Sequence, residues 1–336
     1  MGTMQGMNRW KIPSWLLWVL GGALYGVAMR ALFGVLSTSL KGPMSLAFLI
    51  GTPIAVGALT IHAARSKNPS VWVMAFLPWV SILLMLIGCA VTMMEGAICL
   101  FLLAPLFLLF ASFGGLMMGL ALKVREDRSS SLKAVALLPL LIALGDRGMP
   151  LPDRHLEIRQ SVLVHASPHV VWQQILTARD IRPAELPLSI THLIGVPRPV
   201  EGVNRMTPEG EVRFSRWERG VNFQGVVTNR KEDASITWHY RFDAHSFPKG
   251  SMDEHVAIGG RYFDLDDTTF NLEPMPGGMT RLEIVAHYRV SSAINFYAVP
   301  AADFLGRDFV STILGLYKSR SERAEGAKAV ANLETR

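Results

Sequence analysis

Histidine and aspartate are the side chains of this sequence that could carry acid–base or metal chemistry. Almost all of the histidines lie in the second half: His155, His165, His169, His192, His239, His245, His255 and His287. No two of them have the spacing of a recognised zinc motif. We therefore predict no metal site, and we place His239 and His287 on the polar side of their strands.

An acidic group, Asp264, Asp266 and Asp267, lies near a junction between two predicted strands. A calcium loop would add a central glycine and a distal glutamate, and both are missing, so we predict a solvated turn. Gly-x-Ser-x-Gly and glycine-rich phosphate loops after a strand are also absent. The two cysteines, Cys89 and Cys99, lie in or next to apolar segments. The sequence predicts no cofactor and identifies no catalytic residue.

Aromatic side chains offer a different chemistry, which is contact with an apolar ligand. The candidates for lining a cavity are Trp172, Phe214, Phe223, Trp238, Tyr240, Phe242, Tyr288 and Phe304. An apolar cavity with a few polar anchors is the usual small-molecule site. The candidate anchors are Arg216, Asp308 and again Tyr240. For each aromatic residue taken singly, ordinary core packing is the alternative.

The elements that would position these residues follow a segment with the composition of a membrane domain. Four apolar runs each approach or exceed the roughly 20 residues that cross about 30 Å of hydrocarbon. They are residues 15–36, 44–64, 71–94 and 97–122. We predict a transmembrane helical domain over residues 1–146.

The basic charge of the chain belongs to this first half. Up to Met149 there are 11 Lys and Arg against 4 Asp and Glu, whereas the remainder has 22 against 23. Lys and Arg beside apolar segments set membrane orientation, so this charge does not argue for nucleic acid. The N-terminus and the loop 123–133 are predicted to be cytoplasmic from the positions of Arg9, Lys11, Arg65, Lys67, Lys123, Arg125 and Arg128.

A fifth apolar run, residues 132–144, decides on which side of the membrane the second half lies. It is short for a span, yet it lacks the polar face of an interfacial helix, and Lys133 could extend it by snorkelling. We predict four or five spans in a bacterial inner (plasma) membrane, and we favour a periplasmic C-terminal domain over a cytoplasmic one. Glu95, next to Gly96, is predicted to be a turn residue at the surface.

The second half changes from apolar runs to alternating patterns after the proline-rich residues 149–152. Ser167 and Pro168 have the types expected at the N-cap and first position of a helix. We predict a strand at 155–164, a helix at 168–177, an irregular stretch at 182–209, strands at 211–217, 221–229, 235–242, 261–264, 268–273 and 280–290, and a long helix at about 301–326. Residues 150–326 form the predicted domain, and 327–336 a disordered tail.

A sheet with one apolar face needs a cover, and the terminal helix is the only long one available. The sequence thus predicts a membrane α-helical bundle followed by an α+β domain. In that domain a curved antiparallel sheet surrounds the long C-terminal helix, and a cavity lies between them.

Three segments of this domain resemble those of the SRPBCC superfamily. Ser161-Val-Leu-Val-His-Ala-Ser-Pro-His-Val-Val-Trp172 is similar to its opening strand and helix, and Gly277-Gly-Met-Thr-Arg-Leu-Glu283 to the hairpin that enters its last strand. The terminal helix with Leu316-Tyr317-Lys318 continues the likeness. The resemblance implies the helix-grip fold of START domains, birch-pollen-allergen-like proteins and polyketide cyclases/dehydrases.

What this resemblance implies is an internal pocket for an apolar small molecule, and it implies no reaction, because a fold does not give a function. We expect a membrane-anchored START-like module that binds or transfers a lipid or another hydrophobic small molecule, with the lipid bilayer as its other partner. Two alternatives stay open. One is a polyketide cyclase/dehydrase-like enzyme, in which Asp308 is the first acid to check, and the other is a membrane sensor or assembly protein.

Overall fold

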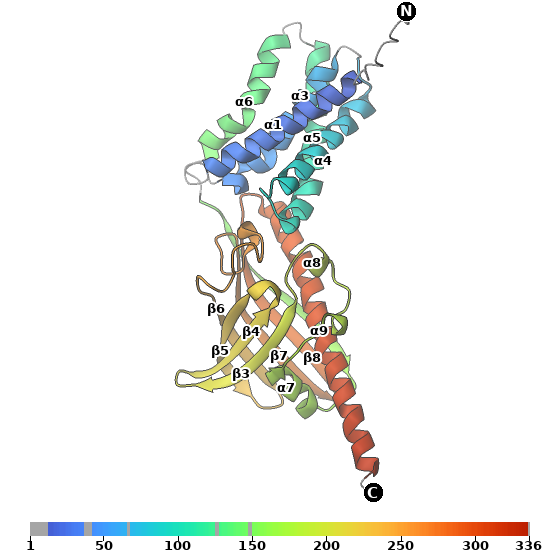
Figure 1. The fold of residues 1–336 in the computed structure, drawn as a ribbon, viewed down its shortest axis with the longest axis vertical. Coiled ribbons are helices and arrows are strands. Elements are labelled where there is room, and N and C mark those ends of the chain that lie inside the picture. Colours follow the sequence, from blue (N-terminus) through green and yellow to red (C-terminus); the bar gives the residue numbers. More distant parts are fainter. Residues whose placement is uncertain (1–12, 37–41, 66–67, 125–127, 147–149, 335–336) are drawn as a thin grey trace, which may run out of the picture. The chain divides into compact units, whose positions relative to one another are not determined.

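The computed structural model describes residues 13–36, 42–65, 68–124, 128–146 and 150–334 (Figure 1). Apart from three residues of one helix, the chain divides after Pro150 into two compact units. Of the basic residues that predict orientation, Arg9, Lys11, Lys67 and Arg125 lie outside the described residues.

The first unit is helical. Its elements are α1 (Ser14–Val35), the 3-10 turn η1 (Gly42–Met44), the π-helical turn η2 (Ala47–Gly51), α3 (Thr52–Ala64), α4 (Val71–Val91), α5 (Ala97–Val124) and α6 (Arg128–Asp146). Among the described residues, four helical segments are long and apolar enough to cross a membrane: α1, η2 with α3, α4, and α5. They coincide with the four runs found in the sequence.

Small residues let the helices of this unit approach one another closely. A Cβ atom on Gly57 of α3 would collide with the backbone of Ala111 in α5, and one on Gly114 of α5 would collide with the backbone of Ile54. Such close approach supplies the van der Waals contact that holds helices together in lipid, where the hydrophobic effect does not. Thr60 and Ser81 add a hydrogen bond of 2.9 Å between α3 and α4.

The fifth apolar run forms α6, which begins earlier than the run itself. Its 19 residues measure about 28 Å at the usual helical rise, but α6 is not one of the four segments that meet the length and hydropathy of a span. It packs against η2 and α3, and the Tyr25 hydroxyl of α1 donates a 2.8 Å hydrogen bond to the carbonyl oxygen of Ala136. A fifth span stays a prediction.

Glu95 does not have the surface position that the sequence predicts. It is buried, and its carboxylate accepts a hydrogen bond of 2.5 Å from Nε of Arg30, whose Nη2 also donates to the carbonyl oxygen of Met94 at 2.6 Å. An ionised side chain in apolar surroundings requires such a partner. The sequence could not supply this pairing, because the two residues lie far apart in the chain.

The second unit is an eight-stranded antiparallel sheet with helices packed on one face (Figure 1). The strands follow one another in space as β1-β8-β7-β6-β5-β4-β3-β2. They are β1 (Asp153–Val164), β2 (Thr177–Ala178), β3 (Pro199–Thr207), β4 (Gly210–Trp217), β5 (Asn222–Lys231), β6 (Ser235–Arg241), β7 (Phe263–Met275) and β8 (Met279–Ser291). The helices are α7 (Pro168–Leu176), α8 (Ile190–Leu193) and α9 (Asn295–Glu334), with the 3-10 turns η4 (Pro183–Glu185), η5 (Glu218–Gly220) and η6 (Glu254–Val256).

The apolar face of the sheet is covered by α7 and α9. On β8, Leu282, Ile284 and Tyr288 alternate with outward-facing side chains and are buried in the same core as Trp172 of α7 and Tyr317 of α9. Figure 1 shows α9, in red, running along this face of the curved sheet. The predicted helix-grip arrangement, a curved antiparallel sheet around a long C-terminal helix, is confirmed.

Two segments differ from the sequence prediction. The stretch 182–209, predicted to be irregular, contains η4, α8 and the whole of β3. Gly202 and several polar residues interrupt the apolar–polar alternation by which a strand is predicted. The strand β3 is stabilised by its pairing with β2 and β4. The two short strands predicted around Asp266 are one strand, β7, because a β-bulge between Leu265 and Asp267 absorbs the extra residue.

The terminal helix is longer than predicted at both ends. It begins at Asn295, before Pro300, and continues to Glu334, through most of the segment 327–336 that the sequence predicts to be disordered. Its last turns contain Ala327, Ala329 and Ala331, and alanine has the highest helix propensity.

The core under α9 generates a stability prediction. Leu282→Ala removes a side chain that is fully buried, and we expect it to lower the free energy of unfolding of this unit by about 2–5 kcal/mol. Leu163→Ala on β1 is the matched control, because Leu163 is 39% exposed and should cost less than about 1 kcal/mol. Urea unfolding of the full-length protein, followed by tryptophan fluorescence, measures both. Equal losses would contradict the assignment of the inner face.

Candidate functional site

An aromatic cluster lies on the inner face of the sheet, between β4, β5, β6 and α9. At its centre is Phe223, whose ring centroid lies 5.1 Å from that of Trp217, 5.7 Å from Tyr240 and 5.6 Å from Phe242. Trp217 also reaches Phe309 of α9 at 5.3 Å. We refer to these residues, together with Phe247, as the aromatic cluster.

Burial falls along β6 toward this cluster. The inward side chains of Ile236 and Trp238 are fully or almost fully buried in the core, whereas Tyr240 and then Phe242, just beyond the end of the strand, are only partly buried. The core is therefore closed at one end of β6 and gives way to partly accessible aromatic surface at the other.

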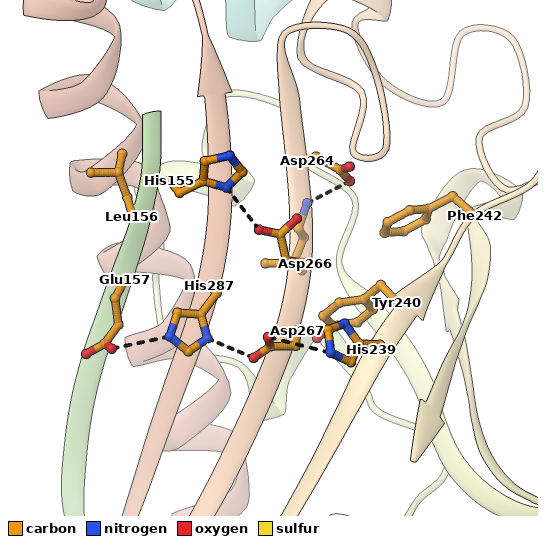
Figure 2. A pocket seen from close by; sticks show the side chains of 11 residues that line it. His155, Leu156, Glu157, His239, Tyr240, Phe242, Asp264, Asp266, Asp267 and His287 are labelled. Carbon is orange, nitrogen blue, oxygen red and sulfur yellow. Dashed lines mark hydrogen bonds and ion pairs between the residues drawn. The ribbon is translucent and has the colours of Figure 1, made fainter. Parts of the chain in front are cut away.

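A pocket lies where β6 and β7 separate. The pairing of these strands ends at His239 and Asp267, although β7 continues to pair with β8 as far as Phe263. The pocket is open to solvent and has a volume of about 760 Å³. Tyr240, Phe242 and Leu265 provide apolar lining, and Figure 2 shows the first two on the β6 side. The remaining lining residues are His155, Leu156, Glu157, His239, Asp264, Asp266, Asp267 and His287.

A row of alternating acids and histidines crosses the outer face of four strands and forms part of the lining of this pocket (Figure 2). Register places Glu157 of β1 opposite His287 of β8, His287 opposite Asp267 of β7, and Asp267 opposite His239 of β6. His287 contacts Asp267 through Nδ1 at 2.8 Å and Glu157 through Nε2 at 3.3 Å, and Nε2 of His239 lies 4.0 Å from Asp267. We refer to these four residues as the rim row.

The rim row changes the acid–base properties of His287. A hydrogen bond with Asp267 raises the pKa of His287 above its ordinary value, against the smaller opposing effect of desolvation. Asp264 and Asp266, predicted to form a solvated turn, lie instead in β7, where Asp266 is 3.6 Å from His155 and Asp264 is 3.8 Å from Arg289. Among the described residues no group of three or more His, Cys, Asp or Glu side chains is arranged to hold a metal ion.

The predicted cavity residues fall into three environments. Phe223, Tyr240 and Phe242 belong to the aromatic cluster. Trp172, Trp238 and Tyr288 belong to the closed core. The remaining two aromatic candidates lie elsewhere: Phe304 is 51% exposed on α9, and Phe214 points to the outer face, where the Arg205 guanidinium lies 5.5 Å from its ring centroid.

Neither charged anchor that the sequence proposes lies in the pocket lining. Arg216 is on the outer face of β4 and pairs with Glu201 at 3.2 Å. Asp308 of α9 accepts hydrogen bonds from the Ser189 hydroxyl at 2.5 Å and from Thr191 N–H and Oγ1–H at 2.8 and 2.7 Å. Burial opposes ionisation of Asp308, but these donors outweigh it and hold its pKa below the ordinary value. Asp308 thus anchors the α8 region to α9 as a carboxylate.

The sequence does not predict that Arg213 lies on the inner face of β4. Val212 and Phe214 alternate as apolar residues, so that face is predicted to be the inner one. The structure has the reverse, because Arg213 points inward and donates hydrogen bonds to the carbonyl of Ile175 and to the hydroxyl of Tyr317. Trp217, Phe247 and Phe309 were also missed. The predicted alternation would have turned Trp217, four residues after Arg213, to the outer face together with Arg213.

No family model and no curated protein matches this sequence. Solved structures match about half of the chain. The Zhui aromatase/cyclase from Streptomyces sp. R1128 is 10% identical, with 51% of this chain and 95% of that chain covered and a TM-score of 0.33. Norcoclaurine synthase from Thalictrum flavum is 10% identical, with 50% and 96% covered and a TM-score of 0.29.

An uncharacterized protein from Bacillus thuringiensis is 12% identical, with 49% of this chain and 98% of that chain covered and a TM-score of 0.31. All of these identities and scores are low. The fold of the second unit therefore rests on its own strand order and helix packing.

The rim row generates a titration prediction. Since the pKa of His287 is raised in the folded state, its contribution to stability is complete below the unfolded value of about 6.5 and is lost as the pH rises through the folded-state pKa. Asp267→Asn should lower the pKa of His287, which NMR of the histidine ring signals measures. Asp264→Asn is the control, because Asp264 pairs with Arg289. An unchanged His287 pKa in Asp267→Asn would contradict the hydrogen bond.

Proposed function

We propose that the second unit binds a hydrophobic small molecule or lipid, and that the helices of the first unit anchor it in the membrane. The observation that carries this proposal is the partly accessible aromatic surface of Tyr240 and Phe242 beside an open pocket of about 760 Å³. A volume of this size is in the range that small-molecule sites occupy. The apolar part of the lining is formed by Leu156, Tyr240, Phe242 and Leu265, and the other seven lining residues are histidines or acids.

The free-energy cost of exposing these aromatic side chains to water favours the binding of a ligand to them. Apolar side chains exposed to water forgo about 25 cal/mol for each Å² that a ligand could cover. The cluster places several rings around Phe223 at centroid distances of 5.1 to 6.5 Å, the separation at which aromatic groups interact. A flat or flexible apolar ligand seated against them would gain both contributions.

Membrane anchoring gives the proposed site a source of ligand. Four helical segments of the same chain can span a bilayer, and attachment raises the effective concentration of a membrane-derived ligand at the pocket. We place the protein in a bacterial inner membrane. The charge distribution puts the loop 123–133 in the cytoplasm, and a fifth span formed by α6 then puts the second unit on the periplasmic side.

The charge state of Asp308 does not fit the acid–base role that the cyclase/dehydrase-like alternative gives to this residue. A general acid or base at neutral pH needs a carboxyl group whose pKa is raised toward 7. The pKa of Asp308 is lowered, and its oxygens already accept hydrogen bonds from Ser189 and Thr191.

Photolabelling tests the proposed site. The full-length protein in membranes is exposed to a diazirine-bearing fatty acid, and the labelled residues are located by mass spectrometry. We expect label on β6 and the segment after it. Phe242→Asp places a charge in the apolar wall and should reduce that label about tenfold, the change that follows from losing about 1.4 kcal/mol.

Phe214→Asp is the matched control for this experiment, since Phe214 lies on the outer face of β4 beside Arg205. It should leave the label on β6 unchanged. Label confined to the membrane helices, or equal loss in both variants, would overturn the proposed site.

A further inference from the structure

Arg213 is a buried cation whose contacts are all with neutral groups. Its side chain extends from β4 into the core, and the residue is 6% exposed. Nη1 donates to the carbonyl of Ile175 at 2.7 Å and to Oδ1 of Asn204 at 3.0 Å, and Nη2 donates to the hydroxyl of Tyr317 at 2.8 Å. The guanidinium also lies over the ring of Trp238, 4.7 Å from its centroid.

No carboxylate among the described residues forms an ion pair with Arg213. Glu211, two residues earlier on the same face of β4, pairs instead with Arg230 at 2.7 Å, and it is connected to Arg213 only through Asn204. A buried charge is costly unless an opposite charge compensates it. The interior of this domain therefore carries a positive charge that its own described side chains leave uncompensated.

Unused hydrogen-bond donors are found in the same core. A guanidinium has five N–H donors, and the three hydrogen bonds above leave Nε–H and one Nη2–H without a partner among the described residues. The indole N–H group of Trp172 is buried without an acceptor as well. Buried donors are normally satisfied, so this excess of donors over acceptors favours a ligand that brings acceptors.

Glycine residues on the neighbouring strands make room for this arrangement. A Cβ atom on Gly202 of β3 would collide with the Arg213 guanidinium, and one on Gly225 of β5, which pairs with Arg213, would lie 2.7 Å from the ring of Trp238. The backbone on both sides of β4 is therefore shaped around the buried guanidinium and the indole beneath it.

Tyr240 connects this cation to the pocket. Its ring belongs to the aromatic cluster and lines the pocket, while its hydroxyl donates to Oγ1 of Thr268 at 2.9 Å. Burial raises the pKa of Tyr240, and the charge of Arg213 is close enough to oppose that rise. Arg213 itself does not line the pocket, so a ligand in the pocket would reach the cation only past Tyr240.

We propose that Arg213 anchors the anionic head group of the bound ligand, so that the ligand class is an acidic amphiphile with a carboxylate at one end of an apolar chain. This inference rests on the proposed binding function. Nε–H and Nη2–H of one guanidinium can hold two oxygens of a carboxylate together, and the Trp238 ring supports the guanidinium from one side at 4.7 Å.

The test compares two probes that differ only in the head group. Binding of oleate and of oleyl alcohol to the full-length protein in amphipol is measured by equilibrium dialysis. Oleate should bind about ten- to a hundredfold more tightly, as a charge-assisted hydrogen bond of about 1.5–3 kcal/mol predicts. Arg213→Met should remove this preference and leave the affinity for oleyl alcohol within about threefold.

Two further variants keep the result interpretable. Arg216→Met removes the same charge from the outer face of the same strand, where Arg216 pairs with Glu201, and it should leave the preference for oleate intact. Arg213→Lys keeps the charge but loses the paired donors, and should retain part of the preference. If Arg213→Met fails to fold, the role of Arg213 is tested by comparing the preference for oleate over oleyl alcohol in the wild-type protein and in Arg213→Lys.

The outcomes separate this inference from the function on which it rests. If oleyl alcohol binds as tightly as oleate to the wild-type protein, the anionic subsite is wrong and the apolar site stands. If neither probe binds, the proposed binding function fails. An oleate preference that survives Arg213→Met would assign the head group to another residue and overturn the role of Arg213.

Discussion

The apolar face of the eight-stranded sheet must be shielded from water, and the organisation of the second unit depends on this requirement. The α7 and α9 helices provide the cover, and α9 comes so close to β1 that a Cβ atom on Gly306 would collide with Ile158. The cover is complete around Trp172 and Leu282 and incomplete around Phe242. The same packing that stabilises the fold thereby leaves one region of aromatic surface beside an open pocket.

The two faces of the sheet differ in how their charged side chains are paired. On the outer face, the strand register pairs each charged group of the rim row with a neighbour of complementary type, as between His287 and Asp267. On the inner face, Arg213 has neutral partners only. Outer charges are partly solvated and contribute little to stability, whereas a buried charge needs compensation. We therefore connect the inner face to recognition of the ligand's charged end, although the rim row also lines the pocket.

The first unit has four helical segments that could cross a membrane, and lipid would offer no hydrophobic driving force between them. Close backbone contact at Gly57 and Gly114 and the buried pair of Arg30 with Glu95 supply cohesion there. Such a unit can hold a ligand-binding domain at a bilayer without contributing any residue to its pocket, which is the division of labour that we propose for this chain.

Elements with local sequence signals could be predicted without the structure. Apolar run length gave the four helical segments of the first unit, and strict alternation gave β6 and β8, so the helix-grip fold and three members of the aromatic cluster, Phe223, Tyr240 and Phe242, could be predicted. Features that depend on partners distant in the chain became visible only in the folded structure. The strand β3 contains Gly202 and is stabilised by pairing with β2 and β4. Arg213 faces inward because the carbonyl of Ile175 and the hydroxyl of Tyr317 accept its hydrogen bonds. Asp308 anchors the α8 region because Ser189 and Thr191 donate hydrogen bonds to it. Local sequence patterns do not predict these three features, because each is stabilised by hydrogen bonds between residues that lie far apart in the chain.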